Sequence, residues 1–203
     1  MLRGRLGRSL TEQPVQAPTS PVGPIRLVNL WWVGAALLVM VAAIKSDDAW
    51  FLNFVHVFCG LLWTGVDLFM GFVVGPVLRK LDFETRRAVM GRLVPRTLFI
   101  MTTLSIITAN TGWFLAVQAG YLDLDYPDKW WVIAALMITT ILTVQGVCLI
   151  LPIELKAYFE MRKREPDMQR FDRLFKFFFY VVASQGVMQV LIIVIMTRFA
   201  TGI

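Results

Sequence analysis

The sequence predicts an all-α fold, a polytopic membrane bundle of five transmembrane helices. Two observations lead to this fold class. Apolar residues make up 57% of the 203-residue chain, and its mean hydropathy of +0.65 is high for a soluble protein. Several apolar runs also exceed the roughly 18 residues that mark a membrane-spanning helix. Helices are favoured because they satisfy their own backbone hydrogen bonds in lipid, whereas barrel strands would alternate over about ten residues.

Each predicted span approaches the roughly 20 residues that cross a hydrocarbon core of about 30 Å. The spans cover residues 27–44, 50–77, 97–119, 130–154 and 177–198, with approximate ends. They divide the chain into a tail, residues 1–25, and a transmembrane bundle, residues 26–203. The tail is rich in Pro, Ser, Thr and Gln, so it is expected to be flexible and cytoplasmic.

The distribution of Lys and Arg predicts the orientation of the bundle. Basic residues gather in the tail and in the connections after the second and fourth spans, whereas the opposite side carries Asp47, Asp48, Asp123, Asp125 and Asp128. The N-terminus is therefore expected inside and the C-terminus outside, in an inner (plasma) membrane. This topology, together with anionic lipid at the inner leaflet, accounts for the net charge of +6. No nucleic-acid partner is needed to explain it.

A short pattern occurs twice and suggests an internal repeat. "PVLRKLDFE" begins at Pro76 and "PIELKAYFE" begins at Pro152, and both fit P-x-x-x-K-x-x-F-E. Each copy ends a span that runs inward and precedes a basic connection. Spans two–three and four–five are therefore candidate parallel repeats. The alternative is that inward spans commonly end in Pro and Lys.

The second span contains two ionisable residues, His56 and Asp67. They are eleven residues apart, which puts them within about 20° of one helix face and about 16 Å apart along the axis, too far to touch. Their face also carries small residues that would let a helix or a flat ligand approach, namely Gly60, Thr64, Gly71 and Gly75. His56 is the only histidine, and it can ligate metal or haem, relay protons or hydrogen-bond a neighbouring helix.

Asp67 is expected either to make a buried polar contact or to serve a proton or cation path. Its candidate partners are polar residues of the later spans, which otherwise act as interhelical hydrogen-bonding groups. Glu154 is expected to be solvated at the inner interface. The candidate partners are Thr103, Asn110, Thr111, Thr139, Thr143, Gln145, Ser184, Gln185 and Gln189.

The stretch "FVHVFCGLLWTG" fits H-x-x-x-G-x-x-W-x-G, with His56, Gly60 and Trp63 at its defining positions. Over roughly residues 50–120 the chain resembles a group of small bacterial helical membrane proteins. The group includes urate oxidase N-terminal-like proteins, copper-resistance protein D-like proteins and small membrane protoporphyrinogen oxidases. The resemblance implies a b-type haem bound through His56, with Gly60 and Trp63 beside it, and a role in electron transfer. Members of this kind generally supply more than one histidine. A haem here would need an open site, a methionine ligand such as Met101, Met137 or Met188, or His56 from a second copy.

Three functions follow from these patterns. The first is haem binding with electron transfer through His56. The second is transport of a small solute, proton or metal ion through a polar interior. The third is a structural subunit that docks a homodimer partner or another membrane subunit. No Walker loop, GxSxG or HExxH motif is present, so the chain is not expected to be an enzyme on its own.

Overall fold

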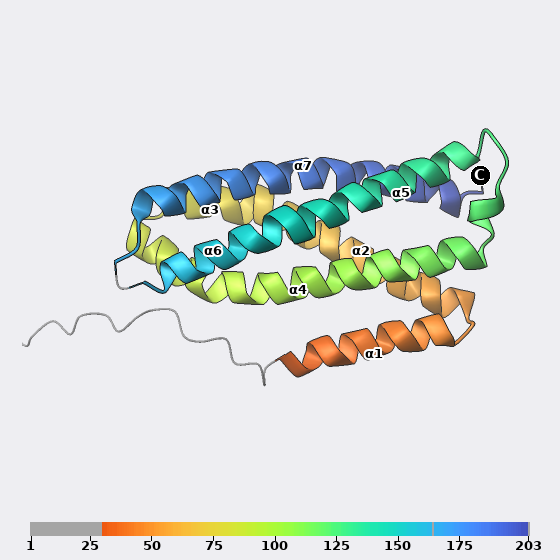
Figure 1. The fold of residues 1–203 in the computed structure, drawn as a ribbon, viewed down its shortest axis with the longest axis horizontal. Helices are drawn as coiled ribbons and strands as arrows, with labels where there is room; N and C mark the ends of the chain where they lie inside the picture. The colour runs from red at the N-terminus through yellow and green to blue at the C-terminus, as the bar shows by residue number, and fades with distance from the viewer. Residues whose placement is uncertain (1–29, 164, 203) are drawn as a thin grey trace, which may run out of the picture.

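The computed structural model describes residues 30–163 and 165–202, and all their regular structure is helical (Figure 1). The fold class all-α is therefore confirmed for these residues. Four helices are long and apolar enough to cross a membrane, which makes this a multi-pass membrane protein. The elements are α1 (Trp31–Lys45), α2 (Ala49–Phe69), η2 (Met70–Val74), α3 (Gly75–Lys80), α4 (Phe83–Gln118), η3 (Tyr121–Asp123), α5 (Lys129–Val144), η4 (Gln145–Ile150), α6 (Leu151–Met161) and α7 (Met168–Ala200).

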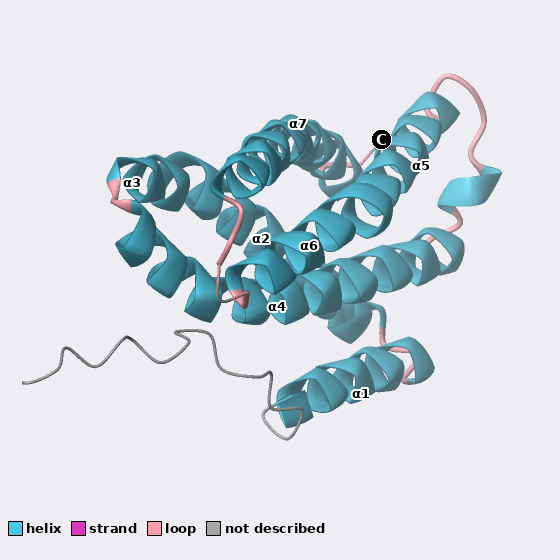
Figure 2. Ribbon diagram, turned by 60° about the vertical axis from the view of Figure 1, so that its left-hand side comes forward, coloured by secondary structure: helices cyan, strands magenta, loops and turns pink. Residues whose placement is uncertain are grey.

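The first predicted span differs from the other four. Its opening residues, 27–29, and the predicted tail, 1–25, lie outside the described residues. The described part, α1, has 15 residues, which corresponds to about 22 Å of helix and is less than the hydrocarbon thickness. In Figure 2, α1 lies alongside α4 at the edge of the bundle, and its contacts are with α2 and α4.

The helices extend beyond the predicted spans at the end where α3 turns into α4. The connection after the second span is not a loop, because α4 begins at Phe83 rather than near residue 97 and continues through Pro95. Likewise α7 begins at Met168 rather than near 177. The length of an apolar run indicates only the part of a helix that lipid surrounds. Arg and Lys are good helix formers, so a helix can continue past that part into a basic segment. At 36 and 33 residues, α4 and α7 are about 54 and 50 Å long.

The two prolines of the repeated pattern produce the same local structure. A π-helical segment precedes each one: η2 before Pro76 and η4 before Pro152. In both, the residue before proline donates its N–H to the carbonyl five residues earlier, Gly75 to Met70 and Leu151 to Gly146. Proline lacks an N–H and crowds the carbonyl four residues before it, which favours the wider turn. The likeness ends there, because α3 stops at Lys80 whereas α6 continues to Met161.

Two groups of buried apolar side chains hold the bundle together. One lies where α1, α2 and α4 meet and includes Ala43, Leu52 and Ile107. The other lies at the opposite end, where α3, α4, α6 and α7 meet, and it is built largely from aromatic and methionine side chains. Its members are Leu78, Met90, Val94, Tyr158, Met161, Phe171 and Phe175. Between these two cores the interior carries polar groups.

Candidate functional site

Asp67 lies in the bundle interior with 8% of its surface exposed. Gln189 of α7 donates a hydrogen bond from Nε2 to Asp67 Oδ2 at 2.7 Å, and Gln189 is 1% exposed. Trp63, one turn earlier on α2, is a weaker donor to the same carboxylate. Gln189 Oε1 is buried and has no hydrogen-bond partner. One of the partners expected for Asp67 is therefore found, and its amide keeps an unused acceptor.

Glu154 belongs to the same interior, which sequence reasoning missed. It lies on α6, two residues after Pro152, and is half-buried. Its carboxylate is close enough to Asp67 for the two charges to interact. Neither carboxylate forms an ion pair within residues 30–163 and 165–202. The proline-linked π segment was the signal, because it changes the helix phase and turns α6 relative to α5.

Two further amides connect α7 to the α5–η4 helix. Gln185, one turn from Gln189 and 2% exposed, makes a long contact from Nε2 to the Leu142 carbonyl at 3.4 Å. Gln145 donates from Nε2 to Ser184 Oγ at 3.2 Å, and its own Oε1 is buried without a partner. We call the set of Trp63, Asp67, Gln145, Glu154, Ser184, Gln185 and Gln189 the polar seam.

The predicted polar residue Asn110 is not part of this interior. Its side chain is exposed and donates to the carbonyl of Ile106 on its own helix, at 2.8 Å. Asn110 is therefore not a partner of Asp67 in this structure, whereas its place as a polar residue within a membrane span stays a prediction. At 3.6 residues per turn, Asn110 lies about 20° from Thr103 and about 60° from Ile107 around α4, so periodicity alone does not separate it from the residues that α4 buries. An asparagine facing outward can satisfy its amide on its own backbone.

His56 makes a contact between α2 and α4. Its Nδ1 lies 2.9 Å from the Thr108 carbonyl and 3.3 Å from Thr111 Oγ1. A carbonyl only accepts, so Nδ1 carries the hydrogen and Nε2 is the free acceptor of the neutral ring. The ring lies against Gly112, where an added Cβ would come within 2.6 Å of His56 Cε1. The missing side chain at Gly112 is thus what admits the imidazole.

The small-residue face of the second span is covered by protein along most of its length. A Cβ added at Gly60 would lie 3.3 Å from Thr108 Cγ2, and one at Gly75 would lie 2.1 Å from Cε1 of Phe179 on α7. Thr64 is buried as well, whereas Gly71 has open space around it. The face therefore meets α4 in its first half and α7 in its second, as interhelical small residues do.

The surroundings of His56 do not fit a haem held by one copy of the chain. The hydrogen bond from Nδ1 to a backbone carbonyl is the kind that orients a ligand histidine. One ring face is closed by Gly112, however, and Gly60 meets Thr108 rather than an open space. Trp63 is buried beside Asp67 and not beside His56. In the described ranges no group of three or more His, Cys, Asp or Glu side chains gathers to hold a metal ion. Haem binding therefore stays a prediction that this geometry does not favour.

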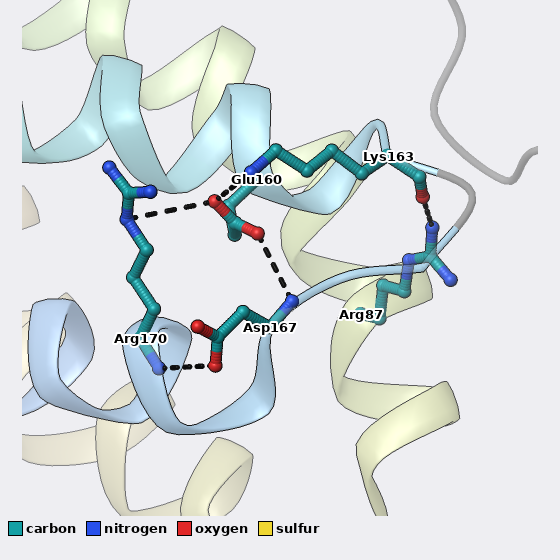
Figure 3. A network of polar contacts seen from close by, with 5 residues as sticks. All are labelled: Arg87, Glu160, Lys163, Asp167 and Arg170. Atoms are coloured by element: carbon teal, nitrogen blue, oxygen red, sulfur yellow. Dashed lines mark hydrogen bonds and ion pairs between the residues drawn. The ribbon is translucent and has the colours of Figure 1, made fainter.

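A second polar cluster closes the α3–α4 end of the bundle (Figure 3). Glu160, 3% exposed, accepts from Lys163 Nζ at 2.8 Å and from the Asp167 backbone N–H at 3.1 Å, and Arg170 Nε lies 3.8 Å away. Arg87 of α4 donates to the Met161 carbonyl at 2.9 and 3.1 Å and to the Lys163 carbonyl at 2.6 Å.

The contact with Arg87 satisfies the carbonyl of Met161, the last residue of α6, which has no partner within the helix. The cluster therefore fixes the end of the helix that carries Glu154. It also ties the α6–α7 connection to α4. We infer that it positions helices and is not a site of chemistry, because the Glu160 carboxylate is paired with Lys163 and Arg170 and the Arg87 guanidinium is held by backbone carbonyls.

Comparisons with known proteins identify the chain at the level of a family. Neither the curated proteins nor the solved structures contain a match to it. A sequence family described as "Domain of unknown function (DUF4149)" matches residues 58–163, slightly more than half of the chain. The match begins within α2 and contains both Asp67 and Glu154. It ends at Lys163, whose backbone carbonyl accepts a hydrogen bond from Arg87. The chain therefore belongs to the DUF4149 family of helical membrane proteins.

Proposed function

We propose that the protein moves a proton or another small cation across the membrane through the polar seam. The observation that carries this proposal is the pair of interior carboxylates, Asp67 and Glu154, which interact with each other and form no ion pair in the part of the chain the structure describes. The predicted spans contain no Lys or Arg between residues 130 and 155 or between 177 and 197. In the proposed mechanism a bound proton or cation supplies the neutralising charge.

The energetic argument supports a working site over a structural one. A carboxylate at the bilayer centre costs about 2.5–3.5 kcal/mol on insertion scales. The Asp67–Gln189 hydrogen bond returns about 0.6 kcal/mol, and at most about 1.7. Two amides would make the same helix contact without the charge. Ionisable residues inside a membrane are commonly part of ion or proton paths for this reason.

The topology we propose has five spans, with the N-terminus in the cytoplasm and the C-terminus outside the inner membrane. It rests on the charges at the two ends of the bundle. The ends of α3, α4, α6 and α7 that meet at one end of the bundle, together with the α6–α7 connection, carry most of the basic residues, whereas the α1–α2 and α4–α5 connections carry Asp47, Asp48, Asp123, Asp125 and Asp128. In this topology α1 is the first of the five spans. Cysteine labelling at the two connections that face opposite sides tests the orientation.

The test of transport uses purified protein in liposomes with a pH-sensitive dye inside. Proton entry under an imposed membrane potential should exceed that of empty liposomes. Asp67→Asn should reduce entry to the empty-liposome level, and Glu154→Gln should slow it. Asp125→Asn is the matched control, because it makes the same chemical change at an exposed carboxylate in the α4–α5 connection. If no proton, sodium or potassium flux depends on Asp67, the proposal is wrong.

Haem binding is the second candidate, and the oriented ring of His56 is the observation in its favour. The Nδ1 hydrogen bond to Thr108 leaves Nε2 as the free acceptor. A second copy of the chain, or a partner subunit, would have to supply the rest of the site. Expression with ample haem, followed by absorption spectroscopy of the purified protein, decides the matter. A Soret band that His56→Ala removes would support electron transfer, and a colourless protein would exclude it.

A further inference from the structure

We propose that the transported ion is a proton and that Asp67 holds it in a cyclic acid–amide pair with Gln189. This inference rests on the proposed transport function and names the ion. Gln189 donates Nε2–H to Asp67 Oδ2 at 2.7 Å, while its own Oε1 is buried and unpartnered. A protonated carboxyl group has one O–H to donate. That O–H supplies the donor that Oε1 lacks.

The geometry of the two planar groups supports this pairing. In an amide the nitrogen and oxygen share one carbon, as do the two oxygens of a carboxyl group. When the two groups are coplanar and Nε2 meets one carboxyl oxygen, Oε1 faces the other oxygen, and two hydrogen bonds can close a ring. The conclusion does not depend on which end of the amide faces Oδ2, because an ionised carboxylate has no hydrogen to donate to Oε1 in either orientation. Leaving Oε1 buried and unpaired is costly, so protonation of Asp67 stabilises the contact.

A metal ion suits the same residues less well. Hard cations such as Ca²⁺ take six to eight oxygen ligands, and Mg²⁺ requires an octahedral set. Within residues 30–163 and 165–202, no three His, Cys, Asp or Glu side chains come together. Gln189 also presents an N–H to Asp67, and an N–H repels a cation. A proton on Asp67 needs only one hydrogen-bond acceptor, and Gln189 Oε1 provides it.

Glu154 is the charged group that interacts with Asp67, and the neighbouring side chains of α2 and α7 are the neutral Trp63, Gln185 and Gln189. When Asp67 is protonated it is neutral, so its repulsion with Glu154 disappears. Release of the proton breaks the O–H bond of Asp67 and forms an O–H bond on an acceptor. Glu154 is the carboxylate close enough to serve as that acceptor. One negative charge then remains in the seam, on Asp67 in place of Glu154. The proton and the charge therefore balance.

Infrared spectroscopy of the full-length protein in lipid nanodiscs tests the pair. At neutral pH the spectrum of the wild type minus that of Asp67→Asn should contain the C=O stretching band of the protonated Asp67 carboxyl group, separated from any band of Glu154. In Gln189→Leu the band should move to higher frequency, because the carboxyl group loses its hydrogen-bonding partner. Gln118→Leu is the matched control, since it makes the same chemical change at an exposed glutamine of α4 outside the polar seam. Its band should stay where it is in the wild type. Size-exclusion profiles and circular dichroism establish that each variant folds.

The outcomes separate this inference from the proposed function. Identical carboxyl spectra for wild type and Asp67→Asn would overturn proton binding at Asp67, even if ion flux through the protein were present. A band that Gln189→Leu leaves unmoved would overturn the pairing. A band that behaves as expected, in a protein that moves no ion in liposomes, would support the acid–amide pair and reject transport.

Discussion

Two glycines of the second span, Gly71 and Gly75, should respond in opposite ways to the same substitution. They are four residues apart, and replacement by alanine removes the same backbone flexibility at both, worth roughly 0.5–1 kcal/mol in a helix. At Gly71 the new Cβ meets nothing within 4 Å, so the variant should be more stable. At Gly75 the Cβ would lie 2.1 Å from Cε1 and 2.4 Å from Cζ of Phe179.

The Phe179 ring has little freedom to move away. It packs edge-on against Phe175 with centroids 4.7 Å apart, and Arg79 lies over it at 5.2 Å. Overpacking of this kind costs about 1–3 kcal/mol. The flexibility term cancels between the two variants, so Gly75→Ala should be less stable than Gly71→Ala by that same amount. At about 2–4 °C per kcal/mol for a chain of this size, the difference in Tm should be roughly 2–12 °C.

Thermal unfolding in one detergent, followed by tryptophan fluorescence, measures this difference. The comparison needs no absolute free energy, because both variants are read against the wild type in the same micelle. Equal Tm values for the two variants would refute the packing of α3 against α7. The account would also fail if Gly71→Ala were the less stable variant.

Three further predictions follow from local contacts. Gly112→Ala should lower Tm and perturb the imidazole NMR signals, because its Cβ would lie 2.6 Å from the ring, whereas Gly65→Ala, with nothing within 4 Å, should not. Arg87→Ala should lower the free energy of unfolding by about 1–3 kcal/mol, because the buried Met161 carbonyl loses its charged donor. Arg92→Ala, on the exposed face of α4, should change it by no more than about 0.5 kcal/mol in the same unfolding assay. Hydrogen bonds with Thr85 lower the pKa of Asp82, the N-cap of α4, below its usual 3.8. Its contribution to stability is therefore present above that value and lost as pH falls through the folded-state pKa, so Asp82→Ala should lower Tm at neutral pH and have no effect in strong acid.

The extent of each helix was only partly predictable from the sequence. The predicted second span, 50–77, matches the continuous helix of α2, η2 and α3 over Ala49–Lys80. The predicted third span, 97–119, ends correctly but omits the first turns of α4. Hydropathy detects the part of a helix that suits lipid, and it says nothing of helix that continues into water. The π segments were not predicted either, although Pro76 and Pro152 mark both of them.

The candidate site shows a different limit. Asp67 and Gln189 were both expected to be polar groups of the interior, because each interrupts an apolar run. Their contact could not be derived, because periodicity fixes which face of a helix a residue occupies and leaves open which helix lies opposite. The same limit explains why Asn110 is not a partner of Asp67 and why Glu154 was missed. His56 was the obvious residue for chemistry, and its contact with Thr108 and Gly112 depends on how closely α2 approaches α4.

The initial rate of proton entry into liposomes under an imposed potential tests the central claim most directly. Wild type, Asp67→Asn and Asp125→Asn should be reconstituted at equal protein density in the same lipid. The account predicts fast entry for the wild type and for Asp125→Asn, and the rate of empty liposomes for Asp67→Asn. Entry by Asp67→Asn at the wild-type rate would contradict a role for the polar seam in transport.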